Sequence, residues 1–255
     1  MRQKIISLLL AVFLIPQLCF SGILFDGSDD YVDVSNSALD FTGNKTISAW
    51  VYILTTADYR PIFSRSRVGG GTSNVGYSLE IATGSNKLMY VKQGVAAIEA
   101  VNTALPANSW HHVAAVKTGT AVTFYLDGVG ETISNSSTEV GGSPPPTYIG
   151  RSARNATSWS GSIDDVHIYN RALSAEQMLG LYSSRLRYYA IAGTAPMGIG
   201  YWPLDDHSDG TSGDGKKFID RSNTGKTGTG NDGANDTGLT CNAGEVLSYP
   251  DEFAQ

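Results

Sequence analysis

The chain has 255 residues and a formal net charge of −6, from 24 acidic and 18 basic residues. An acidic chain lacks the positive surface that attracts phosphates, which argues against nucleic acid as a partner and is compatible with divalent cations. Glycine is abundant, at 29 residues, and only 16% of residues are charged. This composition is typical of many short strands joined by tight turns, and the length suffices for one large all-β domain and a smaller segment.

The N-terminal segment 1–21 has the organisation of a secretory signal peptide. Arg2 and Lys4 precede an apolar run at residues 5–15, and the small residue Ser21 ends the segment. We expect cleavage after Ser21. The apolar run is short for a bilayer span, so a retained membrane anchor is the alternative. The mature protein is then expected to be secreted or displayed at the cell surface, with no membrane span.

Cleavage changes both charge and cysteine content. Losing Arg2 and Lys4 takes the formal charge from −6 to −8, and losing Cys19 leaves Cys241 as the only cysteine. An intrachain disulfide is then impossible. Stability must come from the core, with or without a bound ion.

Short segments rich in β-branched and aromatic residues recur about every ten residues, separated by turn residues, which favours a β-sandwich. The expected strands lie at residues 31–34, 46–53, 61–65, 77–81, 87–91, 110–116, 121–126, 147–150 and 163–169.

The last of these strands carries an acidic residue in an apolar setting. Period-2 alternation places Asp164, Val166 and Ile168 on one face, unless a bulge intervenes. A carboxylate beside an apolar face needs hydrogen bonds or a cation. Asp164 is therefore either an acceptor for backbone amides or a metal ligand.

A short helix is expected directly after this strand. Ser174 and Gln177 have the spacing of a capping box, and Leu173 and Met178 that of a hydrophobic staple. These signals predict a helix that begins next to Ser174.

Three segments resemble laminin-G-like domains of the concanavalin A-like superfamily. Residues 161–174 are similar to the closing strand and exit helix, residues 24–34 to the opening strand, and residues 110–116 with 124–128 to the central hairpin. The resemblance implies an all-β fold: a two-sheet antiparallel jelly-roll sandwich over residues 22–188, ending in the short helix. The same sandwich serves lectins, adhesion modules, enzymes and spacers, so the resemblance indicates fold more sharply than function.

The C-terminal extension, residues 189–255, is rich in Gly, Asp and Asn and too poor in aliphatic residues to close a core alone. Residues 199–206 and 218–225 are similar to the preamble that often precedes the opening strand in this family. Here they follow the domain. The extension is therefore an incomplete second module, a preamble that packs in cis, or a strand donated to a neighbouring chain.

The resemblance also implies a structural calcium ion near the meeting of the opening and closing strands, with Asp26, Asp30 and Asp164 as candidate ligands. A glycine-containing turn such as residues 26–29 can present both carboxylates and carbonyls, which calcium requires in number. The alternative is that these aspartates accept hydrogen bonds from local turn amides.

No enzyme is expected. Retaining glycoside hydrolysis needs two carboxylates about 5 to 5.5 Å apart. The glutamates of the mature chain are instead scattered singly: Glu80, Glu99, Glu131, Glu139, Glu176, Glu245 and Glu252. No serine stands in a nucleophile-elbow sequence to pair with a histidine. His111 and His112 are adjacent in one strand, face opposite sides, and are expected to be structural.

A ligand-binding surface is expected beside the glycine-rich loop 67–76, because sugars bind flat aromatic rings with a few polar groups. The candidate residues are Tyr59, Arg65, Arg67, Asn74, Tyr77 and Tyr90. The favoured function is exported, non-enzymatic binding of a glycan or of a cell-surface or matrix protein, in a matrix or on a virion. The alternatives are a structural subunit that self-associates through residues 189–255 and, third, a glycoside hydrolase.

Overall fold

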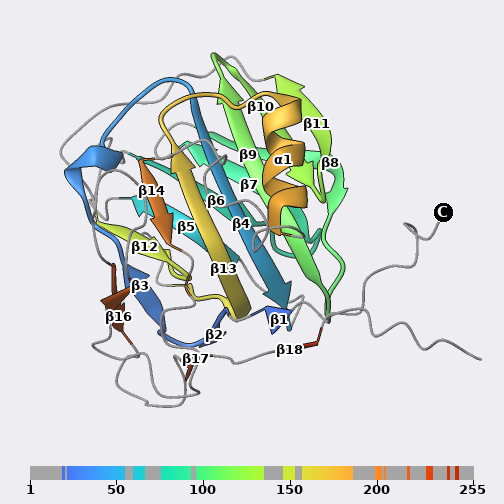
Figure 1. Cartoon of the computed structure of the whole chain (residues 1–255). Helices are drawn as coiled ribbons and strands as arrows, with labels where there is room; N and C mark the ends of the chain where they lie inside the picture. The colour runs from blue at the N-terminus through green and yellow to red at the C-terminus, as the bar shows by residue number, and fades with distance from the viewer. Residues whose placement is uncertain are drawn as a thin grey trace, which may run out of the picture.

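Two antiparallel sheets pack face to face in the computed structural model (Figure 1). The structure describes residues 19–20, 22–54, 60–66, 76–92, 96–134, 146–152, 157–185, 199–202, 204, 217–218, 228–231, 240–241 and 245–246. The all-β sandwich expected from the sequence is confirmed, with one α-helix and one short 3-10 helix among these residues.

The first sheet contains β2 (Ile23–Asp26), β4 (Lys45–Ile53), β9 (Trp110–Thr118), β10 (Ala121–Leu126), β11 (Val129–Ser134), β13 (Ser160–Tyr169), β14 (Gly200–Trp202) and β17 (Thr240–Cys241). Its order is β11-β10-β9-β4-β13-β2-β17, and β14 also pairs with β13.

The second sheet contains β3 (Tyr31–Asp33), β5 (Arg60–Ser66), β6 (Gly76–Ile81), β7 (Lys87–Lys92), β8 (Ala96–Ala104), β12 (Thr147–Ile149), β15 (Lys217–Phe218) and β16 (Gly228–Asn231). Its order is β15-β16-β3-β12-β5-β6-β7-β8. A separate ribbon joins β1 (Cys19–Phe20) to β18 (Glu245–Val246). Because β1 lies in the segment that the sequence predicts to be removed, this ribbon belongs to the uncleaved chain.

The hydrophobic core fills the space between the sheets. In β4 the alternate residues Ile47, Ala49, Val51 and Ile53 all point into this core. Trp50 points the other way, into a smaller buried cluster with Trp110 on the outer face of the first sheet. Both tryptophans are buried, but outside the main core.

A bulge in β13 changes the face that its acidic residue occupies. The register with β4 shifts between Asp164 and His167, and Asp165 adopts a φ of 48°. Val166 and Ile168 enter the core, whereas Asp164 pairs with Trp50 and shares its outer face. The expectation that Asp164 shares a face with Val166 and Ile168 is therefore wrong. The cause is a bulge, the exception that the sequence analysis allowed.

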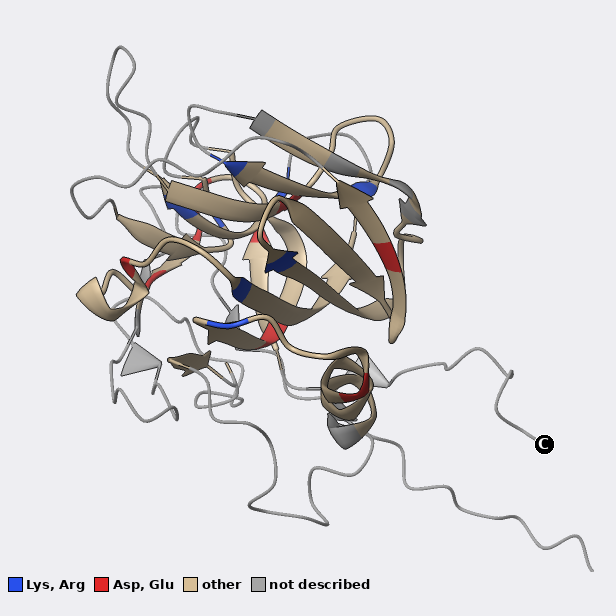
Figure 2. Cartoon of the chain, turned by 90° about the horizontal axis from the view of Figure 1, so that it is seen from above, with Lys and Arg blue, Asp and Glu red and all other residues tan. Residues whose placement is uncertain are grey.

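Helix α1 (Ala175–Arg185) covers part of the outer face of the first sheet. The capping box is confirmed, since the Ser174 N–H donates to Gln177 Oε1 at 3.0 Å and the Gln177 N–H donates to Ser174 Oγ at 3.3 Å. Leu173 and Met178 are buried in one cluster under the helix, as the staple predicts. Figure 2 views α1 end-on beside the sheet. None of the helices in the described ranges has the length and apolar character that a bilayer crossing requires.

The described strands of the C-terminal extension pair within the chain. β14 pairs with β13, β16 with β3, and β17 with β2. Trp202 and Leu204 are buried in the main core. Of the alternatives that the sequence left open, the structure has the one that packs in cis. Self-association through this extension stays a prediction.

Truncation of Trp202 tests whether the extension is integral to the domain. We expect Trp202→Ala to lower the free energy of unfolding by about 3–5 kcal/mol, because it removes a large ring from the core. Chemical denaturation of the mature chain measures this loss. The control Val129→Ala, at a side chain 74% exposed, is expected to change stability by less than about 0.5 kcal/mol. Equal effects of the two changes would show that the extension is not part of the folded core.

Candidate functional site

The turn between β2 and β3 gathers three aspartates. Ligand oxygens of Asp26, Asp29 and Asp30 lie within 4.8 Å of one another. The Asp26 N–H donates to Asp30 Oδ2 at 2.8 Å, and the Ser28 N–H donates to Asp26 Oδ1 at 2.6 Å. Asp30 is 1% exposed, whereas Asp26 and Asp29 are half-buried. Local amides thus position the carboxylates of Asp26 and Asp30.

This turn is anchored to the segment between β12 and β13. Ser158 Oγ donates to the carbonyl oxygen of Ser28 at 2.9 Å, and Arg151 Nη1 donates to that of Asp29 at 3.2 Å. Gly27 adopts a φ of 88°, and a Cβ there would lie 2.9 Å from a side-chain carbon of β13. The turn therefore needs glycine at this position and is held from two sides.

Two tyrosines adjoin the acidic turn. The ring centroids of Tyr31 and Tyr148 are 4.6 Å apart, and the Arg151 guanidinium lies 5.1 Å from the centroid of the Tyr31 ring. All three side chains are half-buried. Burial, and after it the charge of Asp33, raise the pKa of Tyr148 above its ordinary value. We call Asp26, Asp29, Asp30, Tyr31, Tyr148 and Arg151 the tyrosine–aspartate rim.

A row of small hydroxyl side chains continues from the rim along the outer face of the second sheet. Tyr148 pairs with Ser64 across β5, which places both on that face. Ser64 Oγ lies 3.1 Å from Ser66 Oγ, and Ser78 Oγ donates to Glu80 Oε1 at 2.5 Å. These side chains are buried and polar. Because they are at most 2% exposed, they support the neighbouring strands and are not part of the solvent-facing surface.

The donor set of the acidic turn fits calcium, which takes six to eight oxygens from carboxylates, carbonyls and water. Asp26, Asp29 and Asp30 would hold the ion, and water would complete its shell. The ion would join the ends of β2 and β3. The same carboxylates also serve as acceptors for turn amides, so both interpretations of the cluster retain physical support.

The structure separates Asp164 from the other two predicted ligands. Asp26 pairs with the first residue of β13, whereas Asp164 lies four residues farther along that strand, about 13 Å away at the rise of a strand. Asp164 is 1% exposed, and its Oδ1 accepts the Asp165 N–H at 2.8 Å. The structure thus groups Asp26 and Asp30 with Asp29 and leaves Asp164 apart from them, while calcium binding itself stays a prediction.

Three of the predicted ligand-binding residues are buried. Arg65, Tyr77 and Tyr90 are each at most 2% exposed, and the two tyrosine rings belong to the core. The expected exposed surface is wrong for these three, because their strands turn them between the sheets. Tyr59, Arg67 and Asn74 lie outside the described residues.

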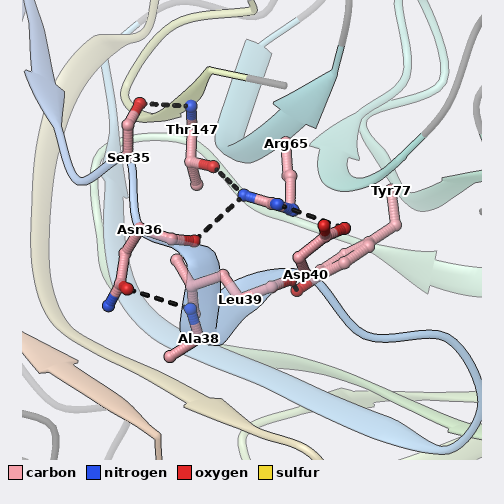
Figure 3. A network of polar contacts seen from close by, with 8 residues as sticks. All are labelled: Ser35, Asn36, Ala38, Leu39, Asp40, Arg65, Tyr77 and Thr147. Carbon is pink, nitrogen blue, oxygen red and sulfur yellow. Dashed lines mark hydrogen bonds and ion pairs between the residues drawn. The ribbon is translucent and has the colours of Figure 1, made fainter. Parts of the chain in front are cut away.

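Arg65 has a structural role where β5 and β12 meet the segment that follows β3 (Figure 3). Its Nη1 donates to Thr147 Oγ1 at 2.7 Å and to the Asn36 carbonyl oxygen at 3.4 Å. Its Nη2 lies 3.4 Å from Asp40 Oδ1. These contacts tie β5 to β12 and to the ends of the short helix η1 (Ser37–Leu39). The Tyr77 hydroxyl adds a further bond to this helix, donating to the Leu39 carbonyl oxygen at 3.2 Å.

Sequence reasoning missed Tyr31, Tyr148 and Arg151. Tyr31 and Tyr148 are far apart in the chain and meet because β12 pairs with β3. The one feature of the sequence that pointed to these residues is that Tyr31 directly follows the acidic turn.

Comparison with solved structures shows the same fold. The CBM40 of the Ruminococcus gnavus IT-sialidase, bound to α2,3-sialyllactose, superposes with a TM-score of 0.54 and 14% identity, covering 63% of this chain and 95% of that one. A native heptameric SAP-like pentraxin from Limulus polyphemus superposes with a TM-score of 0.52 and 18% identity, covering 71% and 87%. A search of the curated proteins finds no match.

At the sequence level, a family model described as the concanavalin A-like lectin/glucanases superfamily matches residues 26–178. That span includes the strands of the rim and runs into α1. The resemblance of the opening, central and closing segments is thereby confirmed, and the chain belongs to the concanavalin A-like lectin/glucanase superfamily.

Proposed function

We propose that this protein is an exported carbohydrate-binding or adhesion module that binds a glycan at the tyrosine–aspartate rim. One observation carries the proposal: two half-exposed tyrosine rings lie beside three clustered carboxylates and a guanidinium. Sugar rings pack their apolar faces on aromatic side chains, while their hydroxyls need polar groups in fixed positions. The rim offers both kinds of contact on one surface.

The fold supports this assignment in a general way. The CBM40 structure, whose fold this chain shares, is bound to a sialyllactose. Binding in place of glycan hydrolysis is the simplest use of the rim, since the carboxylates of Asp26 and Asp30 accept hydrogen bonds from amides of their own turn. Export follows from the N-terminal sequence, and a cell-surface or matrix glycan is the ligand class that an exported module meets.

Calcium is part of the proposal as a structural ion in the acidic turn. Its two positive charges would offset most of the repulsion among three neighbouring carboxylates, and its bonds would fix the backbone that leads into Tyr31. The rim would then be better ordered for its glycan. In this assignment the ion acts on stability first and on binding second.

Thermal unfolding tests the ion. Calcium at about 100 times its dissociation constant is expected to stabilise the mature chain by about 2.7 kcal/mol, because it binds only the folded turn. We expect Asp29→Asn to abolish the upward shift of the midpoint. Asp33→Asn, a neighbouring carboxylate outside the cluster, is the matched control and should retain the shift. If calcium leaves the midpoint of the wild type unchanged, the aspartates are turn acceptors only.

Glycan binding is tested on a glycan array followed by calorimetry with the strongest ligand. Tyr31→Ala and Tyr148→Ala are each expected to weaken binding about two- to tenfold, because each removes a ring from the platform, and one aromatic contact typically contributes about 0.5–1.5 kcal/mol. Tyr148→Phe keeps the ring and separates stacking from hydrogen bonding.

The control for this experiment is Leu179→Ala on α1, a side chain 53% exposed and remote from the rim. It should bind as the wild type does. Binding that survives both tyrosine truncations in folded protein would move the glycan site away from the rim.

A further inference from the structure

A hydrogen-bonded series of serine, histidine and aspartate lies at the start of β9. His111 Nε2 is 2.8 Å from Ser109 Oγ, and His111 Nδ1 is 2.7 Å from Asp127 Oδ2. Ser109 and Asp127 are half-buried, and His111 is 8% exposed. Each ring nitrogen thus faces the partner that it has in a nucleophilic serine triad.

The geometry selects one tautomer of the histidine. Asp127 accepts at Nδ1, so the ring proton sits there, and the lone pair of Nε2 faces the serine hydroxyl. The Ser109 O–H therefore donates to Nε2. This is the tautomer in which an imidazole can take the proton of an attacking hydroxyl.

Asp127 is held in place by groups other than the histidine. Its Oδ1 accepts the backbone N–H of His112 at 2.9 Å, and its own N–H donates to the His112 carbonyl oxygen at 2.9 Å. The next residue, Gly128, lies against α1: a Cβ there would be 3.2 Å from side-chain carbons of Leu179 and Tyr182. The carboxylate is therefore preorganised by the β10–β11 turn and by the helix that packs on it.

Ser109 is reachable from solvent. It follows the exposed residue Asn108, which has a φ of 61° and whose N–H is bonded to the Ile53 carbonyl oxygen at 2.9 Å. Ser109 itself is half-buried, so part of this residue is in contact with solvent beside a fixed turn. Ser109 was not recognised from the sequence, because it lies two residues before His111 at the start of a strand and outside any nucleophile-elbow pattern.

We propose that Ser109, His111 and Asp127 form a nucleophilic site that cleaves esters of small carboxylic acids. The Ser109 oxygen bonds to the carbonyl carbon while its proton passes to His111 Nε2. The ester C–O bond then breaks, and the alcohol leaves with that proton. Water hydrolyses the acyl-serine in the same way, giving the acid and restoring the hydroxyl. Asp127 stabilises the imidazolium in both halves. This activity is independent of glycan binding at the rim.

The mature full-length chain is tested with an alkyl fluorophosphonate, which forms a stable serine adduct with loss of fluoride. Intact mass and peptide mapping should find one adduct, on Ser109, and Ser109→Ala should abolish it. General-base assistance predicts that Ser109 reacts about 10²-fold faster than an ordinary exposed serine. Ser183→Ala, which removes a helix serine bonded to a backbone carbonyl, is the control and should leave labelling unchanged.

The variant Asp127→Asn distinguishes a role of Asp127 in serine reactivity from a role in stability alone. The amide oxygen can still accept the His112 N–H, while the amide nitrogen donates to His111 Nδ1 and forces the wrong tautomer. The labelling rate and the hydrolysis of p-nitrophenyl acetate should fall about 10²-fold or more, with the thermal midpoint preserved. His111→Gln should have the same effect on rate. Absence of an adduct on Ser109 of the folded wild type, or equal labelling of the Asp127→Asn variant, would overturn the proposal and leave the three residues with a structural role.

Discussion

The pairing of β13 on both of its edges is the constraint on which the rest of the structure depends. One edge bonds to β4 along nearly its whole length, and the other is shared by β2 and β14, which come from opposite ends of the chain. At its start Gly161 has a φ of 132°, and a Cβ there would lie 2.0 Å from the Tyr52 carbonyl oxygen. Without glycine at this position β13 could not approach β4.

The bulge divides β13 into two parts with different tasks. Before the bulge, residues 160–163 align β2, which fixes where the acidic turn emerges. After it, residues 166–168 receive β14, which brings Trp202 into the core. The side chain of Asp165, at the bulge itself, accepts a hydrogen bond from the Tyr201 hydroxyl at 2.9 Å. A buried strand that was straight throughout would have placed Asp164 in the core, at the cost of an uncompensated carboxylate.

Local signals in the sequence were sufficient for most of the fold. The capping box at Ser174 needed only four residues, and each predicted strand corresponds to a strand in the structure. β8 and β11 were missed because β8 is rich in alanine and β11 is largely exposed, so neither has the alternation that marks a half-buried strand. The residues of the tyrosine–aspartate rim were harder to predict from the sequence. Tyr148 reaches Tyr31 through sheet register, and no local pattern reports which distant strands become neighbours.

The same strand register places both candidate sites, the acidic turn and Ser109, at the ends of strands. The outer face of the first sheet is largely occupied: α1 covers Ala114 and Tyr125, and Tyr201 of β14 stacks on His167 with ring centroids 4.0 Å apart. What stays accessible is where strands stop and turns begin. Asp26 is the last residue of β2 and pairs with the first residue of β13. Ser109 directly precedes β9, and the first residue of β9 pairs with Tyr52 near the end of β4. The acidic turn and the serine therefore lie at one end of the same sheet, separated by β13 and β4. A rigid sheet holds both at a fixed spacing, and each can change its chemistry without disturbing the core between them.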